Sequence, residues 1–282
     1  MTKTLGIDIS RWQDNNSTPQ KMDFFKAKSA GVTFAFIKAS QQVYMDEDIL
    51  VNWKNAKDAG LLRGAYHFLT WDKPGRDQAR YHWSIIQSDP GELPPVCDFE
   101  WWGTIPSNAY AILWEYLNEL KMLCGRTPMI YTGYSFWMTY GNPAKLDWSQ
   151  FPLWLAYYAA EEYVKIPAPW SKWTFWQYTS KGDGLAFGAE SLDIDKDWFN
   201  GSYDEMLTFA NVPIPVTQPT GHYPHISQLE NIHGELVDLR ARLDADLVAR
   251  QNARAAAQAQ DMASHEAFVR ELDYITNLST PE

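Results

Sequence analysis

Residues 94–102 read Pro-Pro-Val-Cys-Asp-Phe-Glu-Trp-Trp, an apolar run that ends in two acids and two tryptophans. The continuous apolar character predicts a strand over 95–100 that is covered on both faces, as in a parallel sheet. Residues i and i+2 of a strand point to the same face, about 7 Å apart, so Asp98 and Glu100 share a face. Two carboxyls held so close in a partly dry cleft push their pKa values apart, and the one that stays protonated can act as a general acid.

Short apolar runs of the same kind recur along the chain and predict eight strands. They cover residues 5–10, 33–39, 63–69, 95–100, 129–132, 153–157, 174–179 and 192–195. Helical patterns lie between the first five strands, at 20–30, 48–59, 75–87 and 107–124, and Gly31, Gly60 and Gly125 are suited to end three of them. This order predicts an α/β fold, a modified TIM-like (β/α) barrel with reduced helices in its second half. A doubly wound open sheet is the alternative, but no glycine-rich phosphate loop follows the first strand.

Composition and charge exclude several classes of protein. The 282-residue chain has a net charge of −11, which argues against nucleic acid or an anionic membrane as a partner. No uncharged run approaches the length of a bilayer span, so we expect no membrane insertion. Residues 1–10 lack the apolar segment of a secretory signal, so we expect no signal peptide. Cys97 and Cys124 are expected to be reduced, and no spacing of His, Asp, Glu or Cys suggests a metal or cofactor site.

The ends of the predicted strands carry the candidate chemistry, because barrel enzymes place their sites there. The residues at these ends are Asp8, Ser10, Lys38, Tyr66, His67, Asp98, Glu100, Tyr131, Trp154, Tyr157, Trp176, Gln177, Tyr178, Asp193 and Asp195. Acids beside aromatic rings at one mouth are typical of a glycosidase, and 14 Trp in an acidic protein suggest stacking on sugars. Asp8 lies within an apolar strand, where an unpaired charge is costly. The alternative for Asp98 and Glu100 is an ion pair with Lys38 or Arg63, and His67 is interpreted as structural.

Eight stretches in the first 205 residues match a known family in order and spacing. They are GIDISRWQ (6–13), FAFIKAS (34–40), AKDAGLLRGAYHF (56–68), PPVCDFEWW (94–102), PMIYTGYSFW (128–137), PLWLAYY (152–158), WQYTSKG (176–182) and DIDKDWFNGS (193–202). This part of the chain resembles glycoside hydrolase family 25, the Chalaropsis-type lysozymes that are common among phage endolysins. The resemblance implies a metal-free N-acetylmuramidase that cuts the β-1,4 bond between N-acetylmuramic acid and N-acetylglucosamine. Its partner would be the glycan strands of bacterial peptidoglycan.

The resemblance also implies roles for individual residues. Glu100 would be the general acid, while Asp98 would orient the substrate's acetamido group or stabilise an oxocarbenium-like transition state. Asp8 and Asp195 would complete the acidic cluster, with Asp193 as the rival of Asp195. The reaction would retain configuration, with the substrate's own N-acetyl group as a candidate nucleophile. The residues implied to line the saccharide groove are Lys38, Tyr66, Tyr131, Trp154 and Gln177.

The chain departs from the family's pattern in one loop and in its C-terminal part. Gln41-Gln42 stand where many relatives carry Glu-Gly. The barrel is expected over 1–210, followed by a proline-rich linker at 211–225 and a helical tail at 226–282. Apolar residues of the tail recur with 3-4-3-4 spacing, namely Leu229, Ile232, Leu236, Leu239 and Leu243, as in two heptads of a coiled coil.

The tail and the cellular role admit several interpretations. Segment 226–278 can fold back on the barrel, mediate self-association, dock onto a phage component or bind the cell wall. We expect a phage lysin, held in the host cytoplasm until a holin releases it or else carried on the virion. A second class of function is a carbohydrate-binding or virion structural protein without catalysis. The sequence argues against it, because all four candidate acids are present. A chitinase-type hydrolase is disfavoured, because Pro95, Val96 and Cys97 stand where that group carries further acids.

Overall fold

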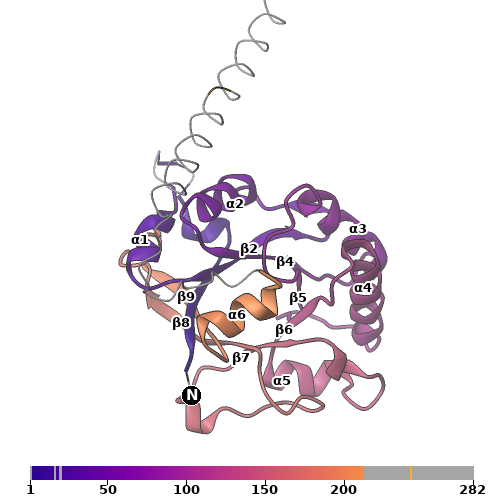
Figure 1. Ribbon diagram of the computed structural model, residues 1–282. Coiled ribbons are helices and arrows are strands. Elements are labelled where there is room, and N and C mark those ends of the chain that lie inside the picture. The colour runs from indigo at the N-terminus through magenta and orange to yellow at the C-terminus, as the bar shows by residue number, and fades with distance from the viewer. Residues whose placement is uncertain (1, 16, 19–20, 213–241, 243–282) are drawn as a thin grey trace, which may run out of the picture. The chain divides into compact units, whose positions relative to one another are not determined.

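The computed structural model describes residues 2–15, 17–18, 21–212 and 242. The chain divides into two units, Met1–Pro215 and Val216–Glu282. The first unit is an α/β barrel (Figure 1). Apart from residues 211, 212 and 242, the predicted linker and helical tail lie outside the described residues, so the proposed roles of the tail stay predictions.

Eight strands close the barrel, each at a position where the sequence predicts one. They are β1 (Thr4–Ile9), β2 (Phe34–Gln41), β4 (Leu62–Phe68), β5 (Val96–Asp98), β6 (Met129–Gly133), β7 (Leu153–Ala156), β8 (Phe175–Asp183) and β9 (Asp193–Phe199). Because β1 pairs with β2 on one side and with β9 on the other, the sheet has no free end, and the open doubly wound alternative is wrong. A short strand that the sequence did not predict, β3 (Tyr44–Met45), forms a hairpin with the end of β2.

The direction of the last strand corrects one expectation. All the other barrel strands run parallel, but β9 is antiparallel to both of its neighbours. The predicted strand 192–195 is in fact the beginning of a longer strand, so Asp193 and Asp195 open it instead of ending it. The physical reason is the connection, since residues 184–192 are too few for the crossover that a parallel strand needs. The start of β9 therefore lies at the same barrel end as the ends of the other strands.

Helices cover only the first half of the barrel, as the sequence predicts (Figure 1). The predicted crossovers are α1 (Phe24–Ser29), α2 (Ile49–Asp58), α3 (Gly75–Ile86) and α4 (Ala109–Cys124). Gly31, Gly60 and Gly125 follow three of them with positive φ, the left-handed conformation that ends many helices. The second half has short turns, namely α5 (Tyr134–Phe136), η2 (Trp137–Gly141), η3 (Trp148–Gln150) and η4 (Glu161–Tyr163), and η1 (Arg11–Gln13) follows β1.

The strands bury apolar residues on both faces, which explains their continuous apolar sequences. Inside the barrel, Phe34, Phe36 and Phe175 contact one another edge to face. A Cβ at Gly6 would lie 2.2 Å from the ring of Phe34, and one at Gly64 would lie 2.4 Å from the ring of Phe36. Only glycine leaves room for these rings, so the two glycines allow the barrel to fill with phenylalanines.

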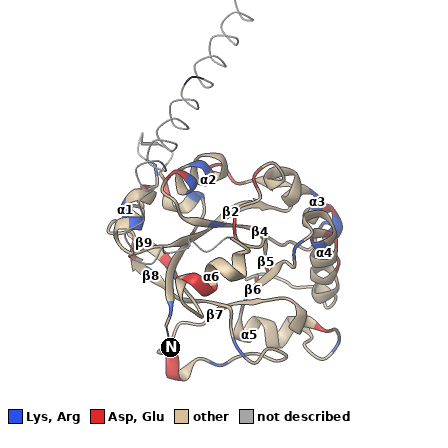
Figure 2. Ribbon diagram, in the orientation of Figure 1, with Lys and Arg blue, Asp and Glu red and all other residues tan. Residues whose placement is uncertain are grey.

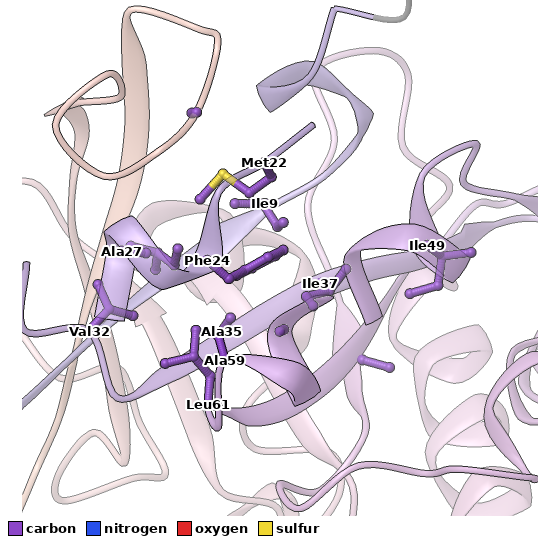
Figure 3. Close-up of a cluster of buried hydrophobic side chains, with 14 of the residues drawn as sticks. Ile9, Met22, Phe24, Ala27, Val32, Ala35, Ile37, Ile49, Ala59 and Leu61 are labelled. Carbon is purple, nitrogen blue, oxygen red and sulfur yellow. The ribbon is translucent and has the colours of Figure 1, made fainter. Parts of the chain in front are cut away.

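Two further apolar layers complete the fold. Outside the barrel, Ile9 and Ile37 pack against Phe24 of α1 and Ile49 of α2 (Figure 3). At the end of the barrel where the parallel strands begin, α6 (Tyr203–Ala210) packs Met206, Leu207 and Ala210 against the inward-facing residues (Figure 1). Helix α6 therefore closes this end of the barrel interior.

Charged residues lie mainly on the helices and loops (Figure 2). On the outer faces of α3 and α4, Arg76 pairs with Glu115, and Arg80 pairs with Glu119 at 2.7 Å. Within the described ranges, no helix is both long and apolar enough to cross a bilayer.

Candidate active site

A cavity of about 280 Å³ opens at the end of the barrel opposite α6. We call it the acidic cavity, because four carboxyls enter it from three parts of the barrel. Its lining residues are Asp8, Ser10, Trp12, Gln13, Lys38, Tyr66, Phe68, Asp98, Glu100, Trp102, Tyr131, Trp154, Tyr158, Gln177 and Asp195.

All nine predicted site residues lie in this lining, although they come from eight strands and their flanks. The acids are Asp8, Asp98, Glu100 and Asp195, and the predicted saccharide-contacting residues are Lys38, Tyr66, Tyr131, Trp154 and Gln177. They meet because they share the inward strand parity of the barrel's phenylalanines, and side chains two residues apart face the same way. The structure thus brings the predicted set together, while the role of each member stays a prediction.

Of the two rival acids on β9, only Asp195 lines the acidic cavity. Asp193 is exposed and forms an ion pair with Lys181, with 2.6 Å between Nζ and Oδ2. The two residues share strand parity, so sequence alone did not separate them. Their positions differ because Asp195 lies opposite Asp8 of β1, whereas Asp193 lies opposite Asp183 at the far end of the hairpin.

The side-chain amide of Gln177 organises the floor of the cavity. Its Nε2 donates to Asp8 Oδ2 at 2.8 Å, while its Oε1 accepts from the hydroxyls of Tyr131 at 2.9 Å and Tyr158 at 2.7 Å. Both ends of the amide are therefore satisfied, and its orientation is set by three partners. This network holds the Asp8 carboxyl in one position, as expected for a preorganised site.

A fifth carboxyl, Asp197, is fully buried next to this network. Trp154 donates from Nε1 to Asp197 Oδ1 at 2.8 Å, and Asp197 lies in register between Gly6 of β1 and Gln177 of β8. Burial raises the pKa of both Asp8 and Asp197, and the charges of Asp195 and Asp197 raise the pKa of Asp8 further. Two neighbouring buried carboxyls cannot both ionise easily, so the pair is most stable when it holds a proton.

Burial also raises the pKa values of the other acids in the cavity. The pKa of Glu100 is raised to about 7, by burial first and then by the charge of Asp195. The pKa of Asp195 is raised to about 6, by burial and then by Asp193. Burial and the charge of Glu100 raise the pKa of Asp98 well above its usual value, and Lys38 opposes this rise. The cavity can therefore hold a protonated carboxyl near neutral pH, which a general acid requires.

The alternative interpretation of Asp98 and Glu100, an ion pair with a nearby cation, is not what the structure contains. Arg63 is buried outside the barrel and binds Asp89 and Glu92, with N–O distances of 2.9–3.1 Å. Lys38 donates from Nζ to Gln41 Oε1 at 3.1 Å. Among the described residues, no ion pair joins Asp98 or Glu100 to a cation, so the two acids are free to act on a ligand.

Several lining residues were not among the predicted site residues. Phe68 and Tyr158 have the inward parity of Tyr66 and Trp154, so following that parity two residues further along the chain would have found them. Trp12 and Gln13 lie on η1, a turn with no periodicity to indicate which way its side chains point. Of the other strand-end residues, His67, Tyr157, Trp176 and Tyr178 lie outside the cavity.

His67 is structural, as the sequence suggested. Its Nδ1 is 2.8 Å from Ser40 Oγ and its Nε2 is 3.2 Å from Gln78 Oε1. Burial lowers its pKa to about 3, so the ring is neutral at physiological pH. Both cysteines are reduced, with Cys97 buried.

Comparisons with known proteins agree with this geometry. Residues 7–185 match the family model described as glycosyl hydrolases family 25. Lysozyme M1 of Streptomyces globisporus is 32% identical over 221 residues, covering 73% of this chain and 71% of that protein. The N,O-diacetylmuramidase of Chalaropsis sp. is 28% identical, covering 73% of this chain and 98% of that enzyme. The crystal structure of the bacterial lysozyme from Streptomyces coelicolor aligns with a TM-score of 0.63 at 30% identity, covering 75% of this chain and 98% of that one.

The family match spans more than half of the chain and runs from within β1 to the end of β8, together with eight of the nine predicted site residues. The ninth, Asp195, follows on the strand that closes the barrel. From the fold, the acidic cavity and these matches, we conclude that the chain belongs to glycosyl hydrolase family 25.

Proposed function

We propose that this family 25 enzyme is a lysozyme that hydrolyses the β-1,4 bond from N-acetylmuramic acid to N-acetylglucosamine in peptidoglycan. The observation that carries the proposal is the placement of Asp98 and Glu100 on one face of one strand end, in a cavity whose burial raises the pKa of Glu100 to about 7. A carboxyl with that pKa holds a proton at mildly acidic pH and can release it to a leaving oxygen.

In the proposed first step, the Glu100 carboxyl donates its proton to the glycosidic oxygen. The bond from that oxygen to C1 breaks as the carbonyl oxygen of the substrate's acetamido group bonds to C1, which gives a cyclic oxazolinium ion. A water molecule then attacks C1 and loses a proton to Glu100, while the acetamido oxygen leaves. Two inversions at C1 retain configuration, and no enzyme carboxylate becomes bonded to the sugar.

Asp98 supports this route through its charge. In the free enzyme its pKa is raised, so its ionised form must be favoured when the substrate binds. An acetamido N–H that donates to Asp98 does this, because a hydrogen bond to the charged form of an acid lowers its pKa. Lys38 acts in the same direction. The ionised carboxylate then stabilises the positive charge that develops on the acetamido group.

A digest of purified Gram-positive peptidoglycan tests both the bond and the acid. The digest is reduced with borohydride and analysed by mass spectrometry, with Glu100→Gln as the comparison and Glu119→Gln, on the outer face of α4, as the control. We expect muramitol ends from the wild type and the control but not from Glu100→Gln. Glucosaminitol ends would contradict the proposed bond, and wild-type turnover by Glu100→Gln would contradict the proposed acid.

We also propose a cellular role as a phage lysin, either released through a holin or carried on the virion. The support is the resemblance of the sequence to lysozymes that are common among endolysins. The full chain should be produced inside a Gram-positive bacterium, with and without a membrane-permeabilising peptide. Lysis only after permeabilisation is the result expected of a holin-dependent lysin. Lysis without the peptide would contradict that route.

A further inference from the structure

A second, aromatic hollow lies beside the acidic cavity. It has a volume of about 280 Å³. We call it the aromatic pocket and define it by Gln41, Gln42, Tyr44, Trp71, Asp72 and Trp101, with Thr70 beneath. The β2–β3 hairpin supplies one wall, while the segment after β4 and the segment after β5 supply the others. Flat aromatic faces next to amide and carboxylate groups are suited to a sugar ring, which offers C–H faces and hydroxyl edges.

Contacts between lining residues connect the aromatic pocket to the acidic cavity. Trp101 of the pocket stacks on Trp102 of the cavity, with ring centroids 5.4 Å apart and an interplanar angle of 7°. Phe68, which lines the cavity, packs against both rings at 5.6 and 5.7 Å. The hydrogen bond from Lys38 to Gln41 forms a second link between the two sites. A polymer that occupies the cavity can therefore continue over these tryptophans into the pocket.

The conformation of Gln42 indicates that the β2–β3 hairpin, which forms one wall of the aromatic pocket, has a role in binding. Gln42 is the first central residue of a two-residue hairpin turn and has φ of 55°, where glycine is favoured. Glutamine has a Cβ that disfavours this φ, so this chain keeps a strained side chain there. Gln42 donates from Nε2 to Asp72 Oδ2, and Thr70 Oγ1 donates to Asp72 Oδ1 at 2.8 Å. The strained backbone places the polar side chain of Gln42 across the mouth of the aromatic pocket, between two loops. Backbone strain of this kind is concentrated at functional sites.

We propose that the aromatic pocket is a second saccharide-binding site, which holds a sugar ring of the same glycan strand beyond the rings in the acidic cavity. This inference rests on the proposed lysozyme function. Tyr44, whose side chain is 69% exposed, and Trp101 provide the stacking faces, while Gln42 and Asp72 bind hydroxyl or acetamido groups. Peptide stems are disfavoured as occupants, because the pocket contains the Asp72 carboxylate and none of its lining residues, all of which are described, is Lys or Arg.

The test measures how kcat/KM depends on the length of peptide-free oligosaccharides of alternating N-acetylglucosamine and N-acetylmuramic acid. The variants are Tyr44→Ala and Gln42→Gly in the full chain, and the matched control is Tyr163→Ala, because Tyr163 is also 69% exposed. We expect the ratio of kcat/KM for long over short substrates to fall about tenfold in both variants, through KM, and to stay unchanged in the control. A tenfold change in this ratio corresponds to the free energy of binding of one stacked ring.

Three outcomes would overturn the proposal: no change in the ratio, an equal loss at every length, or a loss seen only on peptide-bearing glycan. Each of these leaves wild-type muramitol ends intact, so it is distinct from failure of the proposed lysozyme function. If the wild type cleaves nothing, calorimetry of long and short oligosaccharides still decides the case. Weaker binding of only the long oligosaccharide by Tyr44→Ala would support the pocket, and equal binding would overturn it.

Discussion

The two ends of the barrel use the same strands and the same inward parity for opposite purposes. At the end closed by α6, inward residues such as Phe34 and Phe175 bury apolar surface and stabilise the fold. At the other end the same face carries Asp8, Asp98 and Glu100, whose burial costs free energy because their charged forms are desolvated. The α6 end therefore stabilises the fold, and the acidic end destabilises it in order to keep the carboxyls reactive. Substitutions at the two ends should have separable effects on stability and on activity.

The largest expected effect is a loss of activity at the acidic end. Asp98→Asn removes the charge that stabilises the developing positive charge but keeps an oxygen that can accept from the acetamido N–H, so kcat should fall about 10²- to 10⁴-fold with little change in substrate affinity. Steady-state kinetics on peptide-free glycan measures both quantities. Asp183→Asn, at the outer end of the β8–β9 hairpin, is the control. A kcat within a factor of three of wild type would refute the role assigned to Asp98.

The largest expected effect at the α6 end is on stability. Phe175→Ala empties a fully buried site between Phe34, Phe36 and Phe199 and should cost about 3–5 kcal/mol in free energy of unfolding. The folded fraction should keep kcat close to that of wild type. Urea denaturation with activity measured on the same samples tests both statements, and Phe25→Ala serves as control because Phe25 is 62% exposed. A specific loss of kcat without loss of stability would mean that the two ends are not separable.

A smaller effect separates the two acids at the start of β9. Asp195→Asn changes a carboxyl that lines the cavity, whereas Asp193→Asn changes one that pairs with Lys181 at the surface. We expect kcat/KM to fall about 10- to 100-fold in the first variant and less than twofold in the second. Because both are Asp→Asn changes on one strand, the pair controls for chemistry. The reverse order would make Asp193 the functional acid.

The smallest expected effect is the pH dependence of stability. Carboxyls with raised pKa values bind more protons in the folded than in the unfolded state, so their contribution to the free energy of unfolding should fall as pH rises. The window runs from about 4, the usual value of a carboxyl, to about 6 for Asp195 and about 7 for Glu100. Asp89, whose pKa Arg63 lowers to about 2, contributes almost equally above about pH 5, whereas His67, whose pKa burial lowers to about 3, adds stability as pH rises to about 6.5.

Thermal unfolding at pH 5 and pH 8 tests this sign. Relative to Glu100→Gln, in which residue 100 does not titrate, the wild type should lose melting temperature from pH 5 to pH 8. The buried His67 and His82 act in the opposite sense, but they are present in both proteins and cancel in the comparison. Equal differences in the two proteins would mean that Glu100 has an ordinary pKa in the folded state. Phe175→Ala, at the α6 end of the barrel, should leave the difference in melting temperature between pH 5 and pH 8 as it is in the wild type.

Local sequence was sufficient to predict the eight barrel strands and the residues that meet in the acidic cavity. Continuous apolar runs predict strands that are buried on both faces, and the period of two places Asp98 and Glu100 on the face that Val96 turns inward. The first four crossovers are long enough for helices with ordinary caps, so their positions follow from sequence as well. The short connections of the second half likewise indicate its missing helices.

Features that depend on distant partners were not predictable. The pairing of β9 with β1 sets its antiparallel direction and separates Asp195 from Asp193. The hydrogen bond between Gln42 and Asp72 joins two loops, and no period in either segment indicates it. The turn that carries Trp12 has no regular repeat, so its direction depends on what it packs against.

The sequence by itself therefore determined the family, the barrel and the acids that enter its mouth, because strand parity and apolar continuity act over a few neighbouring residues. Only the tertiary structure decided how the barrel closes, which of the β9 acids is buried and how strongly the carboxyls are desolvated. The physical reason is that burial and pairing energies depend on groups distant along the chain. The proton on Glu100 is a property of the cavity that surrounds it.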